Sequence, residues 1–416
     1  MLYAVLGTGQ LDISRSVGDP WSSPVVLGAL LASCATLLLV TGETGRAQTV
    51  GSEHTDFDRH STFSKLSSGK GSGVSVVRSA SGGEVRLADG RTRGTLISKA
   101  YPVGPGFDTL VPSWNARTPG GTWLTVEVRV RDRETGWSRW FSMGNWSSGD
   151  GIVKRGSVNA QSTDRWAVST DTLKSRGRVF ADAYQYRITL NSKEAGRSPV
   201  VRAVSFVSSD SYRHGESADP APDRGAWGEN LAVPGRSQMI YPAGGEVWCS
   251  PTSLSMVMAY WADRRNVAAW NKPVPTVASA TYDNTYRGNG NWPFNVAYAS
   301  SLGLDGDVSR FSSLAQAEKW IEAEVPVVAS ISWGRGQLDG AAIPSSAGHL
   351  LVIRGFTETG DVVVNDPAAS SDASVQRTYD REQFRDAWMR GSGGIVYLVR
   401  PAGWKQPAAE HSGGSW

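Results

Sequence analysis

Cysteine is the residue that this sequence most lacks: its 416 residues include only two, Cys34 and Cys249. Cys34 lies in the apolar stretch 25–40, which is too short for an ordinary membrane span and typical of the core of a secretion signal. A cut after Ala47 would remove it, and a chain with one cysteine can form no internal disulfide. The stability of the mature protein would then come from ordinary buried cores.

Residues 1–47 are therefore predicted to be a signal peptide, and the protein is predicted to be secreted, without stable membrane insertion after signal removal. Two alternatives stay open. The letters LASC at 31–34 are similar to a lipoprotein box, in which Cys34 would be lipidated and retained. The apolar stretch could also be kept as a signal anchor, and either alternative would hold the protein in the membrane at the outer cell surface.

Excess charge and the common metal and phosphate motifs are also absent. Lys and Arg number 42 against 39 Asp and Glu, so the net charge is only +3, and there is no basic run. We therefore expect no nucleic-acid partner. The sequence has no H-E-x-x-H, no C-x-x-C, no intact G-x-S-x-G and no Walker loop, so we expect neither a metal ion nor another cofactor.

Changes of composition divide the rest of the chain. Residues 48–93 are rich in Ser, Gly and charge and are predicted to be a flexible spacer. Residues 94–209 show short alternating runs between turn signals, which indicate an antiparallel β-sandwich of jelly-roll type. Residues 210–229 are polar and irregular and form a linker. Residues 230–402 mix helical and strand patterns, which predicts an α+β domain with an antiparallel sheet, and 403–416 form a tail.

Within the α+β domain, Ser313 with Gln316 forms a capping-box pattern, and Asp380 is a predicted N-cap. The predicted helices are 250–262, 313–324 and 380–390, and the predicted strands are 325–333, 349–356, 361–365 and 394–400.

Cys249 directly precedes the first of these helices. Leu254, Val257, Met258 and Trp261 have the spacing of one buried helical stripe. The positive end of a helix favours a thiolate over a thiol, so Cys249 is a candidate nucleophile. The alternative is a small buried cysteine with no chemical role.

Histidine is nearly as scarce as cysteine. Of five histidines, His54 and His60 fall in the predicted spacer, His214 in the linker and His411 in the tail. Only His349 lies in a patterned segment, at the start of a predicted strand. A lone histidine can be structural, but one that shares a domain with a lone helix-start cysteine is a candidate general base.

The segment 348–367 reads as two strands joined by a four-residue loop at 357–360. If residue 356 pairs with residue 361, Asp366 lies opposite Leu351 and is a diagonal neighbour of His349. Asp366 would then orient the imidazole. A slip of one residue would bring Asn365 there instead, and the letters NDP could also simply end a strand.

At these residues the sequence resembles the papain-like superfamily, in particular the bacteriocin-processing, double-glycine-leader cysteine peptidases of family C39. Members carry a Gln shortly before the Cys, "GH" opening a strand and "DP" closing the next, here Gln238, Cys249, His349 and Asp366. The resemblance covers about residues 230–400. It implies a papain-like peptidase with Cys249 as nucleophile, His349 as base, Asp366 as orienting residue and Gln238 in the oxyanion hole. The leader peptidases proper are fused to a membrane transporter, which these residues lack, so cleavage after Gly-Gly is not expected.

The sandwich segment is rich in tryptophan, and most of these rings are expected in its core. Trp137 and Trp140 have opposite parity and cannot both face inward on one regular strand. The set comprises Trp114, Trp123, Trp137, Trp140, Trp146 and Trp166. Exposed tryptophans commonly stack on sugar rings, so cell-wall polysaccharide is a predicted partner of the sandwich.

The sequence thus predicts a multidomain secreted cysteine peptidase that hydrolyses a peptide or amide bond of a peptide or protein substrate through an acyl-thioester on Cys249. One alternative is a cell-wall amidase or acyltransferase with the same residues. The other is a non-catalytic wall-binding protein with an inactive peptidase-like domain.

Overall fold

The computed structural model describes residues 54–149, 153–214 and 222–408. The predicted signal peptide and its two membrane-anchored alternatives lie outside these residues. The described residues belong to one compact unit. None of the helices in the described ranges is both long enough and apolar enough to cross a membrane.

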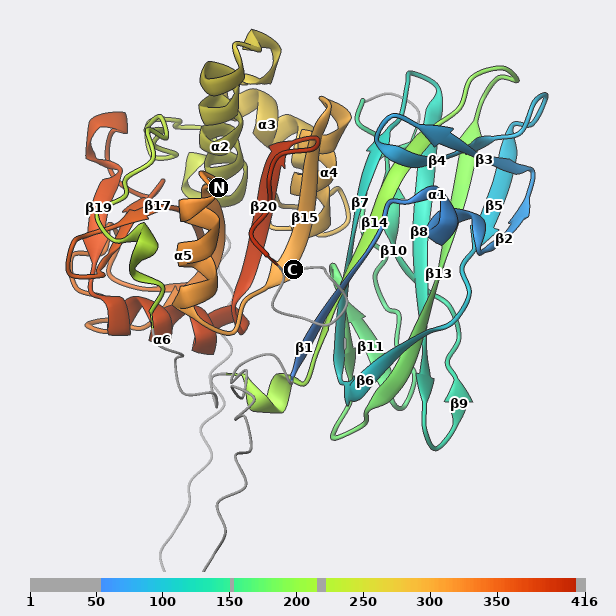
Figure 1. Cartoon of the computed structure of the whole chain (residues 1–416), viewed down its shortest axis with the longest axis horizontal. Helices are drawn as coiled ribbons and strands as arrows, with labels where there is room; N and C mark the ends of the chain where they lie inside the picture. Colours follow the sequence, from blue (N-terminus) through green and yellow to red (C-terminus); the bar gives the residue numbers. More distant parts are fainter. Residues whose placement is uncertain (1–53, 150–152, 215–221, 409–416) are drawn as a thin grey trace, which may run out of the picture. The chain divides into compact units, whose positions relative to one another are not determined.

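The first half of the unit is an antiparallel β-sandwich, as predicted, built from two seven-stranded sheets (Figure 1). Strand β8 alternates strictly between buried and half-buried residues, because one face of its sheet covers the core. The first sheet has the order β11 (Trp166–Ser169), β12 (Thr172–Ser175), β7 (Thr109–Arg117), β14 (Val200–Ser209), β4 (Gly82–Leu87) and β3 (Val74–Ser79), with β1 (Thr55–His60) paired to β14. The second has the order β10 (Phe141–Trp146), β8 (Thr122–Asp132), β13 (Ala181–Ser192), β5 (Arg93–Ile97) and β2 (Lys70–Ser72), with β6 (Tyr101–Phe107) on β13 and β9 (Gly136–Trp137) on β8.

The prediction of a flexible spacer over 48–93 is wrong from residue 54 onward. Strands β1 to β4, helix α1 (Phe63–Ser67) and the start of β5 lie there and belong to the sandwich. Strands β2 and β3 leave nearly all their side chains exposed or half-exposed, so they need few apolar residues and look like a linker in sequence. His60 is fully buried on β1, with its Nε2 3.0 Å from the Tyr184 hydroxyl, and is a core residue of the sandwich.

The expectation that most of the tryptophans lie in the core is wrong. Trp114, Trp146 and Trp166 are buried there, whereas Trp123, Trp137 and Trp140 are half-buried. The Arg129 guanidinium lies 4.8 Å from the ring centroids of both Trp137 and Trp140. One face of each ring is thus already covered by a cation, and binding of polysaccharide stays a prediction.

The second half is the predicted α+β domain. Its sheet is six-stranded and antiparallel, in the order β15 (Leu304–Arg310), β20 (Ile395–Pro401), β16 (Val327–Trp333), β17 (Ser346–Phe356), β18 (Val362–Asn365) and β19 (Gln376–Tyr379). Its helices are α2 (Cys249–Arg265), α3 (Val274–Thr281), α4 (Trp292–Ser301), α5 (Leu314–Glu322) and α6 (Arg381–Ser392). The predicted helices and strands all occur, while α3, α4, β15 and β19 were not expected.

Two local predictions had different outcomes. The N-cap role of Asp380 is confirmed, because its carboxylate accepts hydrogen bonds from the N–H groups of Glu382 and Gln383. The capping box of Ser313 with Gln316 is wrong. The Gln316 side chain reaches one residue further and accepts a hydrogen bond of 2.6 Å from the N–H of Ser312.

The predicted linker and tail are both partly docked onto the α+β domain. At the end of the linker, Trp227 donates from its indole N–H to Glu318 on α5, at 2.8 Å. At the start of the tail, Trp404 packs edge-on against the buried Trp261, with ring centroids 4.7 Å apart.

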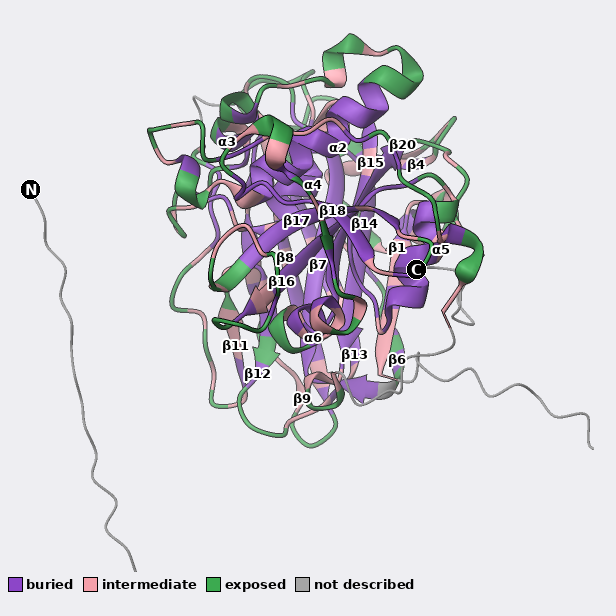
Figure 2. Ribbon diagram, turned by 90° about the vertical axis from the view of Figure 1, so that its left-hand side faces the viewer, coloured by how far each residue is buried: buried purple, intermediate pink, exposed green. Residues whose placement is uncertain are grey.

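Helix α2 is buried along most of its length (Figure 2). The predicted stripe from Leu254 to Trp261 is buried, but so is every other residue from Ser250 to Ala262. The Ser, Thr and Ala residues between the large ones let neighbours pack on all sides of the helix. Its position is therefore fixed by packing along most of its length.

The sandwich and the α+β domain share a packed, hydrogen-bonded interface. Phe294 of α4 packs against the sandwich residues Trp114 and Trp146, with ring centroids 6.1 Å and 5.3 Å away. Strand β15 is an edge strand, and the Asn115 side chain of the sandwich bonds both the N–H and the C=O of its Gly306, at 2.8 Å and 2.7 Å. The sandwich thus covers an edge that would otherwise expose unpaired backbone groups.

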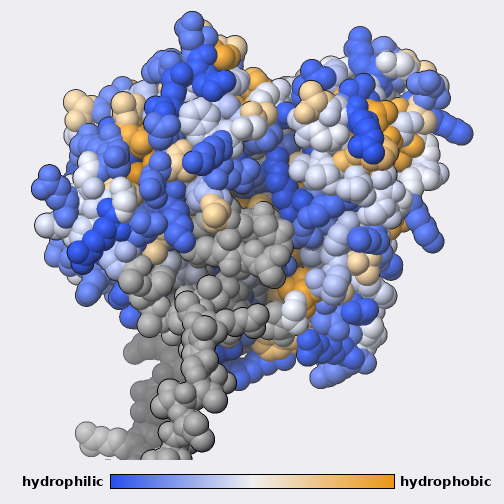
Figure 3. Space-filling view, viewed as in Figure 1, coloured by the Kyte–Doolittle hydropathy of each residue, from blue (hydrophilic) through white to orange (hydrophobic). Residues whose placement is uncertain are grey.

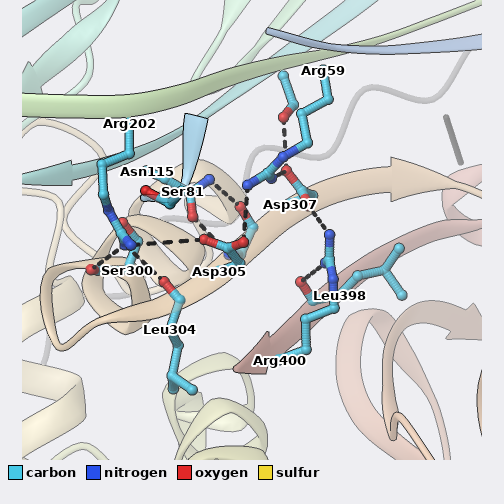
Figure 4. Close-up of polar contacts among 12 residues, drawn as sticks. Arg59, Ser81, Asn115, Arg202, Ser300, Leu304, Asp305, Asp307, Leu398 and Arg400 are labelled. Carbon is cyan, nitrogen blue, oxygen red and sulfur yellow. Dashed lines mark hydrogen bonds and ion pairs between the residues drawn. The ribbon is translucent and has the colours of Figure 1, made fainter. Parts of the chain in front are cut away.

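A buried charge cluster completes this interface (Figure 4). Asp307 of β15 pairs with Arg59 from the sandwich and, at 3.0 Å, with Arg400 from β20. Asp305 pairs with Arg59 at 3.3 Å and with Arg202 at 3.9 Å. Burial raises the pKa of Asp307, but the two guanidinium charges outweigh it and hold that pKa below its usual range.

We expect Asp307→Ala to lower the free energy of unfolding by about 3–5 kcal/mol, because it takes away the carboxylate that pairs with the buried Arg400. Urea denaturation at pH 7 measures this. Asp386→Ala is the matched control, since Asp386 is half-exposed and pairs with Arg390 on the surface, where a loss of about 0–1 kcal/mol is expected. Equal losses for the two variants would contradict the assignment.

Candidate active site

Cys249 is the first residue of α2, and Trp248 is the N-cap. Burial raises the pKa of the Cys249 thiol. A hydrogen bond and the positive charge of His349, together with the N–H groups of Leu350 and Ser250, outweigh burial and lower this pKa below its ordinary value. The helix start therefore favours a thiolate, as the sequence suggested.

His349 lies on β17, as expected, and is almost fully buried. Its Nε2 is 2.8 Å from Oδ1 of Asp366, and Trp333 packs edge-on against the imidazole, with centroids 5.6 Å apart. Burial alone would lower the pKa of His349. The charge and hydrogen bond of Asp366, followed by those of Cys249, raise it to about 10. Both shifts favour the form of the pair in which Cys249 is a thiolate and His349 an imidazolium.

Asp366 follows β18 directly and is completely buried. Its Oδ2 accepts a hydrogen bond of 2.7 Å from the Tyr379 hydroxyl, and its Oδ1 accepts one of 2.9 Å from the N–H of Ala368. Burial raises the pKa of Asp366, but the charge and hydrogen bond of His349 outweigh it and keep the carboxyl ionised. Tyr379 lies on β19, and no motif in the sequence marks it.

The predicted register between β17 and β18 is only partly correct. Phe356 pairs with Val362 rather than with residue 361, but a bulge between Ile353 and Gly355 makes up the difference, and Asn365 pairs with Val352. Asp366, the next residue, therefore reaches His349. Asn365 instead donates to the carbonyl of Val233 at 3.0 Å, so the alternative with Asn365 beside the histidine is not what the fold adopts.

Gln238 lies in the same site, on the loop that precedes α2. Its backbone N–H donates to the carbonyl of Pro367, one residue after Asp366, at 2.8 Å. The loop doubles back so closely that a Cβ on Gly245 would lie 2.2 Å from the Gln238 carbonyl oxygen, so only glycine fits there. The side chain is buried, and its Oε1 has no hydrogen-bond partner among the described residues.

Gln238, Cys249 and His349 line one cavity of about 1020 Å³, called the Cys249 cavity below. The molecular face drawn in Figure 3 is mainly hydrophilic, with hydrophobic residues in small separate patches. Large exposed hydrophobic residues are few in the described ranges, yet three of them, Met239, Val247 and Tyr286, line this cavity. Its rim therefore offers apolar contacts to a bound chain.

The arrangement suits acyl transfer to sulfur. A thiolate, an imidazolium and an orienting carboxylate are connected in that order, and a buried amide side chain lines the same cavity. In the part of the chain that the structure describes, no three His, Cys, Asp or Glu side chains converge as a metal site requires.

Two family models match the chain. Residues 52–209 match the one described as Peptidase C39 N-terminal domain, and residues 230–395 match the Peptidase_C39 like family. No curated protein matches the chain. One solved structure, from work on carbohydrate-binding modules of the β-sandwich superfamily, aligns with 40% of this chain at 12% identity and a TM-score of 0.16. The chain covers 61% of that structure, and so weak a likeness carries no argument.

The first match begins at residue 52, in agreement with the strands found before residue 94. The second contains Gln238, Cys249, His349 and Asp366. The chain therefore contains a domain that matches the Peptidase_C39 like family, preceded by a domain that matches the Peptidase C39 N-terminal domain.

Proposed function

We propose that this protein is a cysteine peptidase that hydrolyses a peptide bond through an acyl-thioester on Cys249. The observation that carries the proposal is the buried chain of contacts from Cys249 through His349 to Asp366, at a helix start and on the wall of a large cavity. The apolar stretch at 25–40 supports secretion, which detection of a chain cut after Ala47 in culture medium would test.

In this mechanism the Cys249 thiolate attacks the scissile carbonyl carbon, and the carbonyl oxygen becomes an oxyanion. The intermediate then collapses, the C–N bond breaks, and the amine leaves with the proton from His349. Neutral His349 next takes a proton from water, whose hydroxide attacks the thioester and releases the acid and the thiolate. Asp366 keeps the imidazole in one tautomer throughout, with its Nε2 toward the carboxylate.

Two alternatives use the same site differently. Both an amidase and an acyltransferase would form the same acyl-thioester. The amidase would release a different amine, and in the acyltransferase a nucleophile other than water would attack the thioester. A non-catalytic wall-binding protein would not need a thiol with a lowered pKa beside an imidazolium, and the contacts at Cys249 therefore favour an enzyme.

We expect Cys249→Ser and His349→Ala each to lower turnover by about a thousandfold or more, because the three residues act as a unit. Asp366→Asn should cost less, since its role is to orient. Peptide cleavage by each variant, with thermal unfolding to check the fold, measures these effects. Near-normal turnover in Cys249→Ser would remove Cys249 as the nucleophile.

The ion pair predicts an unusual pH profile for alkylation of Cys249 by iodoacetamide. The rate at pH 7 should be closer to its value at high pH than it is for an isolated thiol, because the hydrogen bond and charge of His349 lower the thiol pKa. In His349→Ala the thiol loses its partner, and its pKa should return to 9 or above. Alkylation of that variant at pH 7 should then be about a hundredfold slower than at high pH. Identical profiles for the two proteins would contradict the ion pair.

Gln238→Ala should lower turnover by about a hundredfold or more with little change in substrate binding, the range typical of one lost oxyanion donor. The side-chain amide lines the Cys249 cavity and can donate to the developing charge without carrying a charge of its own. Gln238→Glu should be at least as damaging, because a carboxylate would face the oxyanion. Steady-state kinetics measures both variants, and normal turnover in Gln238→Ala would leave the oxyanion to backbone groups.

A further inference from the structure

The Cys249 cavity is not built by the peptidase-like domain alone. Residues Ser169 to Thr172, which form the turn between β11 and β12 of the sandwich, line it together with Cys249 and His349. The N-terminal domain therefore supplies part of the wall that a bound substrate would touch.

This turn is fixed in place by α4 of the peptidase-like domain. Oδ2 of Asp171 accepts a hydrogen bond of 2.8 Å from the N–H of Trp292, the first residue of α4. Two residues further along, Phe294 is held among the sandwich tryptophans. Thr170 has a φ of 54°, which a β-branched residue rarely adopts. Such a conformation persists because the surroundings hold it, as is common at ligand sites.

Asp171 is a buried carboxylate without a cation. It is 6% exposed, and its Oδ1 accepts a hydrogen bond of 3.1 Å from the Thr172 hydroxyl. No Lys, Arg or His within the described ranges forms an ion pair with it. Burial, with a smaller contribution from the charge of Asp283, raises the pKa of Asp171 to about 7 against the hydrogen bonds from Trp292 and Thr172.

The carboxylate and the reactive thiol belong to residues that line the same cavity. Burial raises the pKa of Tyr397, a hydrogen bond from Ser250 opposes this, and the charges of Asp171 and Cys249 both raise it further. Both groups are thus within electrostatic reach of one phenol. The other ionisable side chains on the cavity wall, besides Cys249 and His349, are Glu246, Arg287 and Tyr286, which are exposed.

An independent observation also indicates a ligand in this cavity. Gln238, on its wall, is 2% exposed and leaves its Oε1 without a partner among the described residues. Buried polar groups of folded proteins are normally bonded, so an orphan on a cavity wall indicates a bound group.

We propose that Asp171 is a specificity-determining residue that binds a cationic group of the substrate, either a lysine or arginine side chain or a free amine. The proposal rests on the proposed peptidase function. The folded protein already holds this carboxylate out of water, so a substrate cation gains a strong charge-assisted bond, whereas an uncharged group leaves the carboxylate unpaired. The N-terminal domain thereby sets which substrates the nucleophile receives.

Protection of Cys249 from iodoacetamide tests the proposal without requiring peptide cleavage. The competing ligands are N-acetyl-lysine amide, with only a side-chain cation, norleucine amide, with only an α-amine, and N-acetyl-norleucine amide, with neither. We expect one cationic ligand to protect the wild-type thiol at about tenfold lower concentration than the uncharged one, and Asp171→Asn to abolish the difference. Protection by N-acetyl-lysine amide would indicate a site for a side-chain cation, and protection by norleucine amide would indicate a site for a free α-amine.

Asp171→Asn keeps an acceptor for the N–H of Trp292, so the turn should stay in place, and an unchanged thermal unfolding temperature checks this. Asp164→Asn is the matched control on the same hairpin, because Asp164 is exposed and outside the cavity, and it should behave as wild type.

Equal protection by charged and uncharged ligands, no protection by any, or an unchanged cation preference in Asp171→Asn would each overturn the proposal. If cation-dependent protection is seen but no peptide is cleaved, the peptidase function fails and the cation site stands.

Discussion

The thiol of Cys249 meets His349 because helix α2 is tied to the sheet at its first turn. Ser250 bonds the Tyr397 hydroxyl of β20 at 3.0 Å, and Ser253 donates to the carbonyl of Leu350 on β17, also at 3.0 Å. Burial on all sides then leaves the helix no other position. This packing brings the positive helix end to His349, and Asp366 contacts the other side of the imidazole from the end of β18.

Helix α4 fixes the sandwich to the α+β domain, as α2 is fixed to the sheet. Its Phe294 packs against the sandwich core, and the N–H of its first residue, Trp292, donates a hydrogen bond to the carboxylate of Asp171. The same interface contains the ion pairs of Asp307 with Arg59 and Arg400. Because Asp307 and Arg400 are buried, removal of either partner would leave an uncompensated charge away from water. The sandwich is thus fixed to the peptidase-like domain, and its turn forms part of the wall of the Cys249 cavity. The proposed role of Asp171 in substrate binding depends on this fixed position.

The sequence was most informative where chemistry needs rare residues. Cys249 and His349 could be found because so few cysteines and histidines compete with them, and Asp366 because a hairpin pattern brought it near. Even there a bulge near Ile353 corrected a wrong register. Local pattern could not identify strands at exposed sheet edges, such as β3, because they carry little apolar signal. Nor could it identify Asp171 or Tyr379, whose contacts depend on long-range packing.

The central claim is that Cys249 carries the acyl group during turnover. Acid-quenched mass spectrometry of the protein during cleavage of a peptide mixture tests it most directly. The account predicts that the fragment containing Cys249 gains the mass of the acyl half of a cleaved peptide, and that the adduct is absent in His349→Ala. The claim would be contradicted if cleavage proceeded with no adduct on Cys249 and also continued after Cys249 had been fully alkylated.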